Sequence, residues 1–95
     1  MVDFEIHFTE GFAGEIIDTL VDGRVLATTR LQTRFQIGLA HVEKLQTADG
    51  EEVTLRLGRN NETRFRLDAT QPFVTVMLDD GRLTIATSKT SPGYL

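Results

Sequence analysis

Hydrophobic and polar residues alternate along most of the chain. In the first stretch, residues 2–9, every second position is apolar. A period of two sends successive side chains to opposite faces of a β-strand, so this stretch predicts a strand with one buried and one solvated face. No segment shows the 3.6-residue period of a helix. Further strands are predicted at residues 15–21, 24–30, 40–47, 52–57, 63–67, 73–78 and 83–87, and an alternating run at residues 35–39 ends or bulges at residues 38–40.

Three Asp-Gly pairs, at residues 22–23, 49–50 and 80–81, separate these apolar stretches. A type I′ turn needs positive φ at both central residues, which makes Asp-Gly a strong hairpin signal. A two-residue loop at 22–23 places Leu20 opposite Val25. It also places Ile17 opposite Thr28, and Glu15 opposite Arg30 as an opposite-charge pair.

The same rule at 80–81 places Leu78 opposite Leu83. Both faces of this hairpin carry apolar residues, so we predict that it lies centrally in its sheet. At 49–50, a hairpin joins residues 40–47 to 52–57 and places Val42 opposite Leu57.

The strands at 52–57 and 63–67 keep their apolar residues on one face only if an odd loop joins them. A three-residue loop at 59–61 satisfies this condition. In that register Arg56 lies opposite Arg64, and Thr54 lies opposite Arg66.

These elements predict an all-β fold, most simply an antiparallel β-sandwich of seven or eight short strands, with a small barrel as the alternative. We expect one domain over residues 1–95, with a C-terminal tail at 88–95. The size and strand count resemble those of immunoglobulin-like or transthyretin-like sandwiches. This is a likeness of architecture alone, which implies no particular activity.

The composition excludes several classes of function. The 95 residues include no cysteine, which removes disulfides, thiolate metal sites and cysteine nucleophiles. The net charge of −4 argues against a nucleic-acid partner. No apolar stretch approaches the roughly 20 residues of a membrane span, and no leader pattern opens the sequence. We therefore expect a cytoplasmic protein with no membrane partner.

An arginine cluster is the first candidate site. The predicted register sets Arg56 against Arg64, with Arg66 beside them and Arg59 at the loop end. Opposed like charges destabilise a sheet unless something offsets them. If Glu43 lies across from Arg56, the row is an ordinary solvated face. The alternative is a binding site for an anion or an acidic partner, because arginine matches carboxylates and phosphates.

Acidic residues form the second candidate. Loops of some β-sandwiches pool carboxylates to bind calcium, which takes 6–8 oxygen ligands. Aspartate is favoured in Asp-Gly turns in any case. Calcium binding is therefore the alternative to a purely structural role in the turns, and we expect no cofactor. The tentative metal ligands are Asp22, Asp49, Asp79 and Asp80. Asp3, Glu5 and His7 also share one strand face, which we interpret as solvated.

Catalytic residues are scarce. The only serines, Ser88 and Ser91, lie near the tail and outside any Gly-x-Ser-x-Gly motif, so we predict that the protein is not an enzyme. Phe12, in a glycine-flanked loop, is either an exposed anchor for a partner or a plug beneath the sandwich. The tail at 88–95 ends in two large apolar residues, Tyr94 and Leu95, and we expect it to dock on its own domain or on a neighbouring subunit.

By exclusion, the sequence predicts a non-catalytic protein-interaction or self-assembly module. Its expected partner is another protein or a second copy, as a homo-oligomer, because sheet edges need pairing or cover. The alternative is a ligand-binding module for calcium, carbohydrate or a small anion. A small hydrolase or isomerase subunit is a third possibility.

Overall fold

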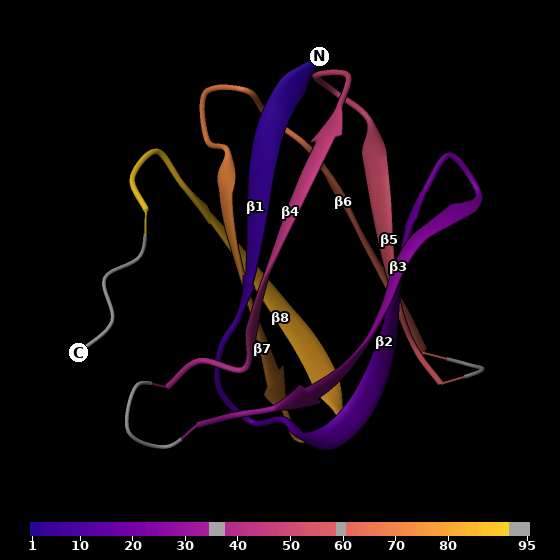
Figure 1. The fold of residues 1–95 in the computed structure, drawn as a ribbon, viewed down its shortest axis with the longest axis vertical. Coiled ribbons are helices and arrows are strands. Elements are labelled where there is room, and N and C mark those ends of the chain that lie inside the picture. The colour runs from indigo at the N-terminus through magenta and orange to yellow at the C-terminus, as the bar shows by residue number, and fades with distance from the viewer. Residues whose placement is uncertain (35–37, 59–60, 92–95) are drawn as a thin grey trace.

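Eight β-strands make up the protein in a computed structural model that describes residues 1–34, 38–58 and 61–91. They form two packed four-stranded sheets, so the predicted all-β sandwich is confirmed (Figure 1). The strands are β1 (Val2–Phe8), β2 (Ala13–Val21), β3 (Arg24–Gln32), β4 (His41–Thr47), β5 (Glu52–Leu57), β6 (Asn61–Arg66), β7 (Phe73–Asp79) and β8 (Arg82–Ser88).

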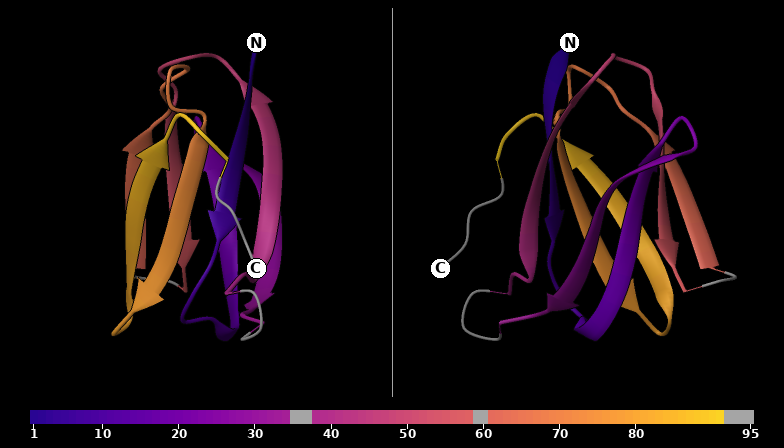
Figure 2. Two further views of the ribbon diagram at one scale, coloured as in Figure 1. Left: turned by 90° about the vertical axis from the view of Figure 1, so that its left-hand side faces the viewer. Right: turned by 45° about the vertical axis from the view of Figure 1, so that its right-hand side comes forward.

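Sheet A has the strand order β4-β1-β7-β8, and sheet B has the order β3-β2-β5-β6. Figure 2 (left) shows the strands of sheet A side by side, with β1 between β4 and β7. The β1–β7 pair is parallel, so the expectation of a wholly antiparallel sandwich is wrong at this pair. Both strands start from the same end of the sandwich, and no local turn signal reports a pairing between segments so distant in sequence.

The core follows the period of two. On β1, Phe4, Ile6 and Phe8 are all buried and face sheet B, where Val53 and Leu55 of β5 are buried as well. Removing such apolar surface from water makes the largest favourable contribution to the stability of the fold. Other buried apolar residues are Phe12, Ile17, Val21, Leu31, Leu67, Val74, Val76 and Leu83.

The turn between β7 and β8 is the predicted type I′ turn. Asp80 and Gly81 have φ angles of 51° and 77°, and Leu78 lies opposite Leu83 as expected. The hairpin is not central, however, because β8 is the outermost strand of sheet A. Of the apolar residues on its second face, Phe73 lies edge-on to His7 of the neighbouring strand β1, and Met77 is 37% exposed.

The β2–β3 hairpin keeps its predicted register only near the turn. Asp22 and Gly23 have φ angles of 53° and 75°, and Leu20 lies opposite Val25. A β-bulge then leaves Leu26 without a partner, since Thr19 pairs with Ala27. The extra residue shifts the next five pairs, from Thr19–Ala27 to Glu15–Leu31, by one, and a second irregularity between Ala13 and Glu15 restores the original offset.

The shift corrects the predicted charge pair. Glu15 lies opposite Leu31, and Arg30 lies opposite Ile16. Ile17 likewise lies opposite Thr29 rather than Thr28. The Glu15–Arg30 pair is therefore absent from this hairpin.

The predicted hairpin at 49–50 is wrong, because β4 belongs to sheet A and β5 to sheet B. Only Gly50 has positive φ there, so the geometry is not that of a type I′ turn. Instead, the connection crosses between the sheets and is tied to the β6–β7 loop. The Asp49 carboxylate accepts a hydrogen bond from Ala69 N at 2.8 Å. Val42 and Leu57 are consequently not partners.

The β5–β6 register differs by two residues from the prediction. Pairing starts at Leu57 and Asn61, so the three-residue connection covers 58–60 rather than 59–61. Gly58, with φ of 70°, begins it. The inward and outward faces are as predicted, since a shift of two preserves them.

Candidate functional site

The outer side of β3 is an unpaired edge of sheet B. With nine residues, β3 is as long as its neighbour β2 and longer than the other edge strands. An edge strand presents unpaired N–H and C=O groups along its free side. We call the free side of residues 24–32 the β3 edge (Figure 1).

The other edges are shorter or covered. β4 carries the adjacent charges Glu43 and Lys44, which discourage strand pairing. β6 and β8 contact each other on the opposite side of the sandwich. There the Asn61 amide donates a hydrogen bond to Gly81 O at 2.8 Å. Of the four edges, β3 is therefore the longest.

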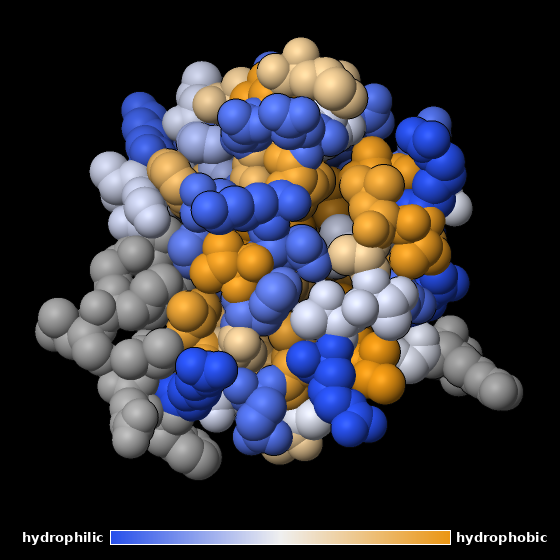
Figure 3. All heavy atoms as spheres, viewed as in Figure 1, coloured by the Kyte–Doolittle hydropathy of each residue, from blue (hydrophilic) through white to orange (hydrophobic). Residues whose placement is uncertain are grey.

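Apolar side chains are exposed on the hairpin that β3 forms with β2. Val25 is 51% exposed, Leu26 is 48% exposed, and Ile16 of β2 is 48% exposed. Figure 3 shows apolar side chains gathered over the end of this hairpin, at the right of the view. Exposed apolar residues clustered beside an unpaired edge are typical of an interaction surface.

Positive charge is concentrated on the same element. Residues 23–42 contain three arginines and no acidic residue, a formal charge of +3 that leaves −7 on the rest of the chain. We call residues 23–42 the acid-free segment. The arginines are Arg24 and Arg30 on β3 and Arg34 just beyond it, all three exposed. Within the described residues none of them forms an ion pair.

Two acidic side chains contact β3. The Thr28 hydroxyl donates a hydrogen bond to Asp18 Oδ1 of β2 at 2.7 Å, and Glu43 of β4 is the second. The Thr29 hydroxyl donates a hydrogen bond to Glu43 Oε1 of β4 at 3.3 Å. The same oxygen lies 3.6 Å from His41 Nε2. Glu43 is thus occupied at the seam between the two sheets.

The arginine cluster that the sequence predicted is arranged differently. Arg56 lies opposite Glu62, and its Nε is 3.6 Å from Asp18 Oδ2. Arg64 lies opposite Thr54, so the two arginines do not oppose each other.

Acidic residues alternate with these arginines across the outer face of sheet B. Arg64 is paired at 3.4 Å with Glu62. Arg66 lies opposite Glu52 and donates a hydrogen bond to Gly50 O at 2.8 Å. The predicted row with Glu43 is wrong, since Glu43 lies opposite Ile6 in sheet A. Arg59 lies outside the described residues.

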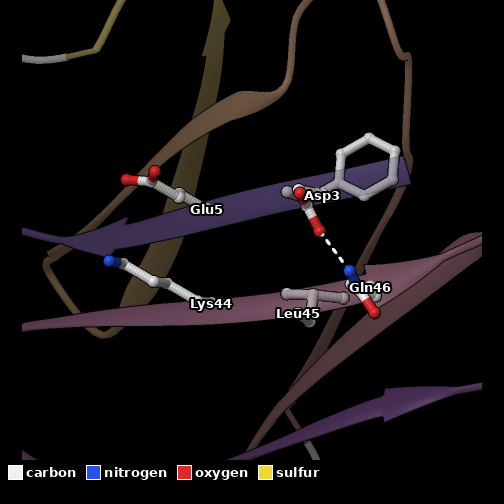
Figure 4. A pocket seen from close by; sticks show the side chains of 6 residues that line it. Asp3, Glu5, Lys44, Leu45 and Gln46 are labelled. Atoms are coloured by element: carbon white, nitrogen blue, oxygen red, sulfur yellow. Dashed lines mark hydrogen bonds between the residues drawn. The ribbon is translucent and has the colours of Figure 1, made fainter. Parts of the chain in front are cut away.

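A hollow of about 490 Å³ lies over β1 and β4 (Figure 4). The Asp3 and Gln46 side chains point toward each other across it and form a hydrogen bond of 2.6 Å. Glu5 lies opposite Lys44 in the strand register. These polar groups satisfy one another in the manner of an ordinary sheet face.

His7 corrects the prediction of a solvated face. Its side chain is buried, with Nε2 at 2.9 Å from Glu5 Oε1 and the ring edge-on to Phe73 at 6.5 Å. β1 is an interior strand, so neighbours flank its outer face on both sides. A carboxylate beside an imidazole fixes the orientation of the ring. The Ser88 hydroxyl forms a hydrogen bond with the Thr90 hydroxyl and not with this pair.

The tentative metal ligands lie at opposite ends of the sandwich. Asp22 and Asp49 belong to connections at the upper end of Figure 1, whereas Asp79 and Asp80 belong to the turn at the lower end. Among the described residues, no group of three or more acidic or histidine side chains is placed to hold a metal ion.

Phe12 is buried, at 2% exposure, and stacks edge-on against Phe8 with ring centres 6.0 Å apart. Its backbone exchanges hydrogen bonds with Thr33, whose N–H donates to Phe12 O and whose hydroxyl accepts from Phe12 N. The alternative of a loop plug is the correct one, so Phe12 offers no exposed anchor. Tyr94 lies outside the described residues, as does the end of the predicted tail.

A second hollow, of about 410 Å³, opens beside Phe12 between the β1–β2 loop and the residues after β3. Glu10 and Gln32 are among its polar lining residues. No side-chain hydrogen bond draws them together, and the lining is otherwise mostly glycine, alanine and phenylalanine.

Comparisons with protein-family models, with curated proteins and with solved structures give no match. In the described part of the chain, no helix has the length and apolarity needed to cross a membrane. The function of the site is therefore inferred from the geometry and charge of its own residues.

The β3 edge was not predicted from the sequence, although a signal was present. The net charge of −4 averages over the whole chain and so conceals the acid-free segment in the N-terminal half. A shorter counting window finds it. That β3 is an unpaired edge, however, depends on the strand order.

Proposed function

We propose that this protein is a non-catalytic interaction module that binds an extended segment of a partner protein as an added strand along the β3 edge. In this mode of recognition, main-chain hydrogen bonds supply affinity and alternate side chains supply specificity. The observation that carries the proposal is the unpaired nine-residue edge.

The exposed apolar residues support the same surface. Val25 and Leu26 adjoin the free edge near the turn, and Ile16 lies opposite Arg30 on the outer face of sheet B. A strand added to β3 would shield part of these side chains from water, at about 25 cal/mol per Å² of apolar area removed. No cost of reorganising the sheet is involved, because β3 is already extended.

Self-assembly through this edge is the nearest competing function. It is less favoured because two copies of β3 would bring arginines together without any acidic partner. We assign no catalytic role to the Glu5–His7 pair, in which His7 is buried and Glu5 is partly exposed on the outer face of sheet A.

The test is to map peptide binding on the isotopically labelled protein by NMR. Nine-residue peptides without proline, selected by display for binding, are titrated into the protein. We expect the largest amide shift changes in β3 and protection of its outward N–H groups from exchange. Changes confined to other strands would contradict the proposal.

Paired variants sharpen the test. Val25→Ser with Leu26→Ser removes the exposed apolar surface and should weaken peptide binding by about tenfold, the equivalent of roughly 1.4 kcal/mol. Met77→Ser is the control, since Met77 is a 37% exposed apolar residue on sheet A. It should leave the affinity unchanged. Equal effects of both changes would contradict a site at β3.

A further inference from the structure

We propose that the strand captured at the β3 edge is acidic, with carboxylates spaced to meet the arginines of the acid-free segment. This inference rests on the proposed function and goes beyond it by naming the chemistry of the partner. It is carried by the distribution of charge, which is separate evidence from the unpaired edge itself.

The three arginines are available for a partner. Arg24, Arg30 and Arg34 are exposed and form no ion pair with the described residues. Arg56 and Arg64, in contrast, each lie within 4 Å of a carboxylate of their own sheet. Arg66 and Arg82 form no ion pair with the described residues either, but Glu52 and Asp79 lie opposite them in the strand register. Arg24 and Arg30 lie opposite Val21 and Ile16, so no acidic residue of the neighbouring strand faces them.

Their spacing suits an extended ligand. Arg24 lies opposite Val21 and Arg30 lies opposite Ile16, five residues apart on β2, which corresponds to about 17 Å at 3.3 Å per residue of strand. The bulge at Leu26 places the two arginines on opposite faces of sheet B, so a bound strand meets both with acidic residues five positions apart. Guanidinium groups bind carboxylates through two parallel hydrogen bonds, which fixes register as well as adding affinity.

A second copy of this chain fits this edge less well. Antiparallel pairing of β3 with itself sets one acid-free segment against another, each with a charge of +3. Like charges across an interface disfavour the pairing. The remainder of the chain, with a charge of −7, also repels polyanions such as nucleic acid. A short acidic strand is attracted by the arginines and, unlike a long polyanion, lies against little of the negatively charged remainder of the chain.

The experiment compares three capped nine-residue peptides. One carries glutamate at positions 2 and 7 among valine and threonine residues, and the others replace each glutamate with glutamine or with lysine. Affinity is measured by calorimetry at low and at high salt, and the site is mapped by NMR. We expect the glutamate peptide to bind at least about tenfold more tightly than the glutamine peptide at low salt, with the advantage shrinking as salt is added.

Two triple variants of equal charge serve as test and control. Arg24→Gln, Arg30→Gln and Arg34→Gln together should abolish the preference for glutamate. The control replaces Arg64, Arg82 and Lys89 with glutamine and should preserve it, since these exposed residues lie away from the β3 edge. An equal loss in both variants would mean that net charge alone drives binding and would overturn the inference.

The other outcomes separate the two proposals. Equal binding of all three peptides at β3 would overturn the acidic partner but leave strand addition intact. No change at β3 with any peptide would overturn both. Concentration-dependent dimerisation through β3 would identify a second copy as the occupant, against the inference. Tighter binding of a short single-stranded oligonucleotide than of the glutamate peptide would also overturn it.

Discussion

Gly11 illustrates how a single residue fixes the path of the chain. It lies in the loop between β1 and β2, with φ of 93°, where a Cβ atom would come within 1.8 Å of Leu78 O. The loop is held there because Leu78 N donates a hydrogen bond to Glu10 O. Only glycine fits such a close approach of two backbones.

Replacing Gly11 with alanine should therefore destabilise the fold strongly, by about 3 kcal/mol or more, because backbone cannot move aside as a flexible side chain does. Gly14→Ala is the control, since Gly14 has φ of 100° but open space around its Cβ position. It should cost only the left-handed penalty, about 1–2 kcal/mol. Urea unfolding measures both, and equal losses would disprove the role of the Leu78 contact.

Asp68 gives stability a pH dependence. Its carboxylate accepts hydrogen bonds from the Thr70 hydroxyl at 2.7 Å and from Thr70 N at 2.9 Å. The Thr70 hydroxyl, followed by the Thr70 backbone N–H, lowers the pKa of Asp68 below its ordinary value of 3.8. A lowered pKa in the folded state means stability that is present above pH 3.8 and lost as the pH falls through the folded pKa.

Asp68→Asn keeps an oxygen acceptor but removes the charge. The parent should unfold at a higher urea concentration than the variant at pH 7. The difference should shrink below about pH 4 and vanish once Asp68 is protonated in both states. Urea midpoints measured across this range give the result, and a gap that does not change with pH would contradict it.

Residue patterns identified most of the core but not every exception. Phe4, Ile6 and Phe8 are buried as their spacing predicts. His7 is buried as well, on the opposite face, because β1 has neighbours on both sides. Alternation reports which face a side chain takes, and burial on that face depends on the neighbouring strands.

At the scale of elements, short loops determined the hairpins that the sequence predicted well. Asp80 has φ of 51°, a conformation that aspartate tolerates better than alanine. Asp80→Ala should cost about 1 kcal/mol, whereas Asp80→Asn should cost little. Asp79→Ala removes the same charge from a residue of ordinary φ. Thermal unfolding compares the three, and a loss in Asp79→Ala as large as in Asp80→Ala would point to charge instead.

The errors in register have distinct causes. In β2–β3, the bulge at Leu26 has no sequence signal of the Asp-Gly kind, and it shifts the next five pairs by one. In β5–β6, choosing between loops at 58–60 and 59–61 required the conformation of Gly58. The β2–β3 error misplaced Arg30, and the β5–β6 error misplaced Arg64 and Arg66. The predicted cluster around Arg56 was therefore an effect of the β5–β6 register.

At the scale of the whole molecule, the sequence predicted the class of fold but not the strand order. The pattern could not report that residues 49–50 cross between sheets, or that β3 is an edge. Both facts depend on pairings between distant segments. The candidate site was unpredictable for the same reason, although its charge could be read from residues 23–42.

Long-range pairing also predicts the folding rate. β1 pairs with β7, and β2 pairs with β5, so most contacts join segments far apart in sequence. Proteins of this kind fold in milliseconds to seconds. Stopped-flow circular dichroism is the suitable measurement, because the chain has no tryptophan and a single tyrosine. Folding within microseconds would contradict the strand order.

The position of β1 has a consequence for synthesis. Sheet A cannot be completed until β7 has been synthesised, because β1 pairs with β4 on one side and with β7 on the other. At about 5–20 residues per second, the ribosome delivers the parallel partner several seconds after β1. Through that delay Phe4, Ile6 and Phe8 have at most β4 beside them. A nascent chain of this protein is thus an apolar target for chaperones until its seventh strand emerges.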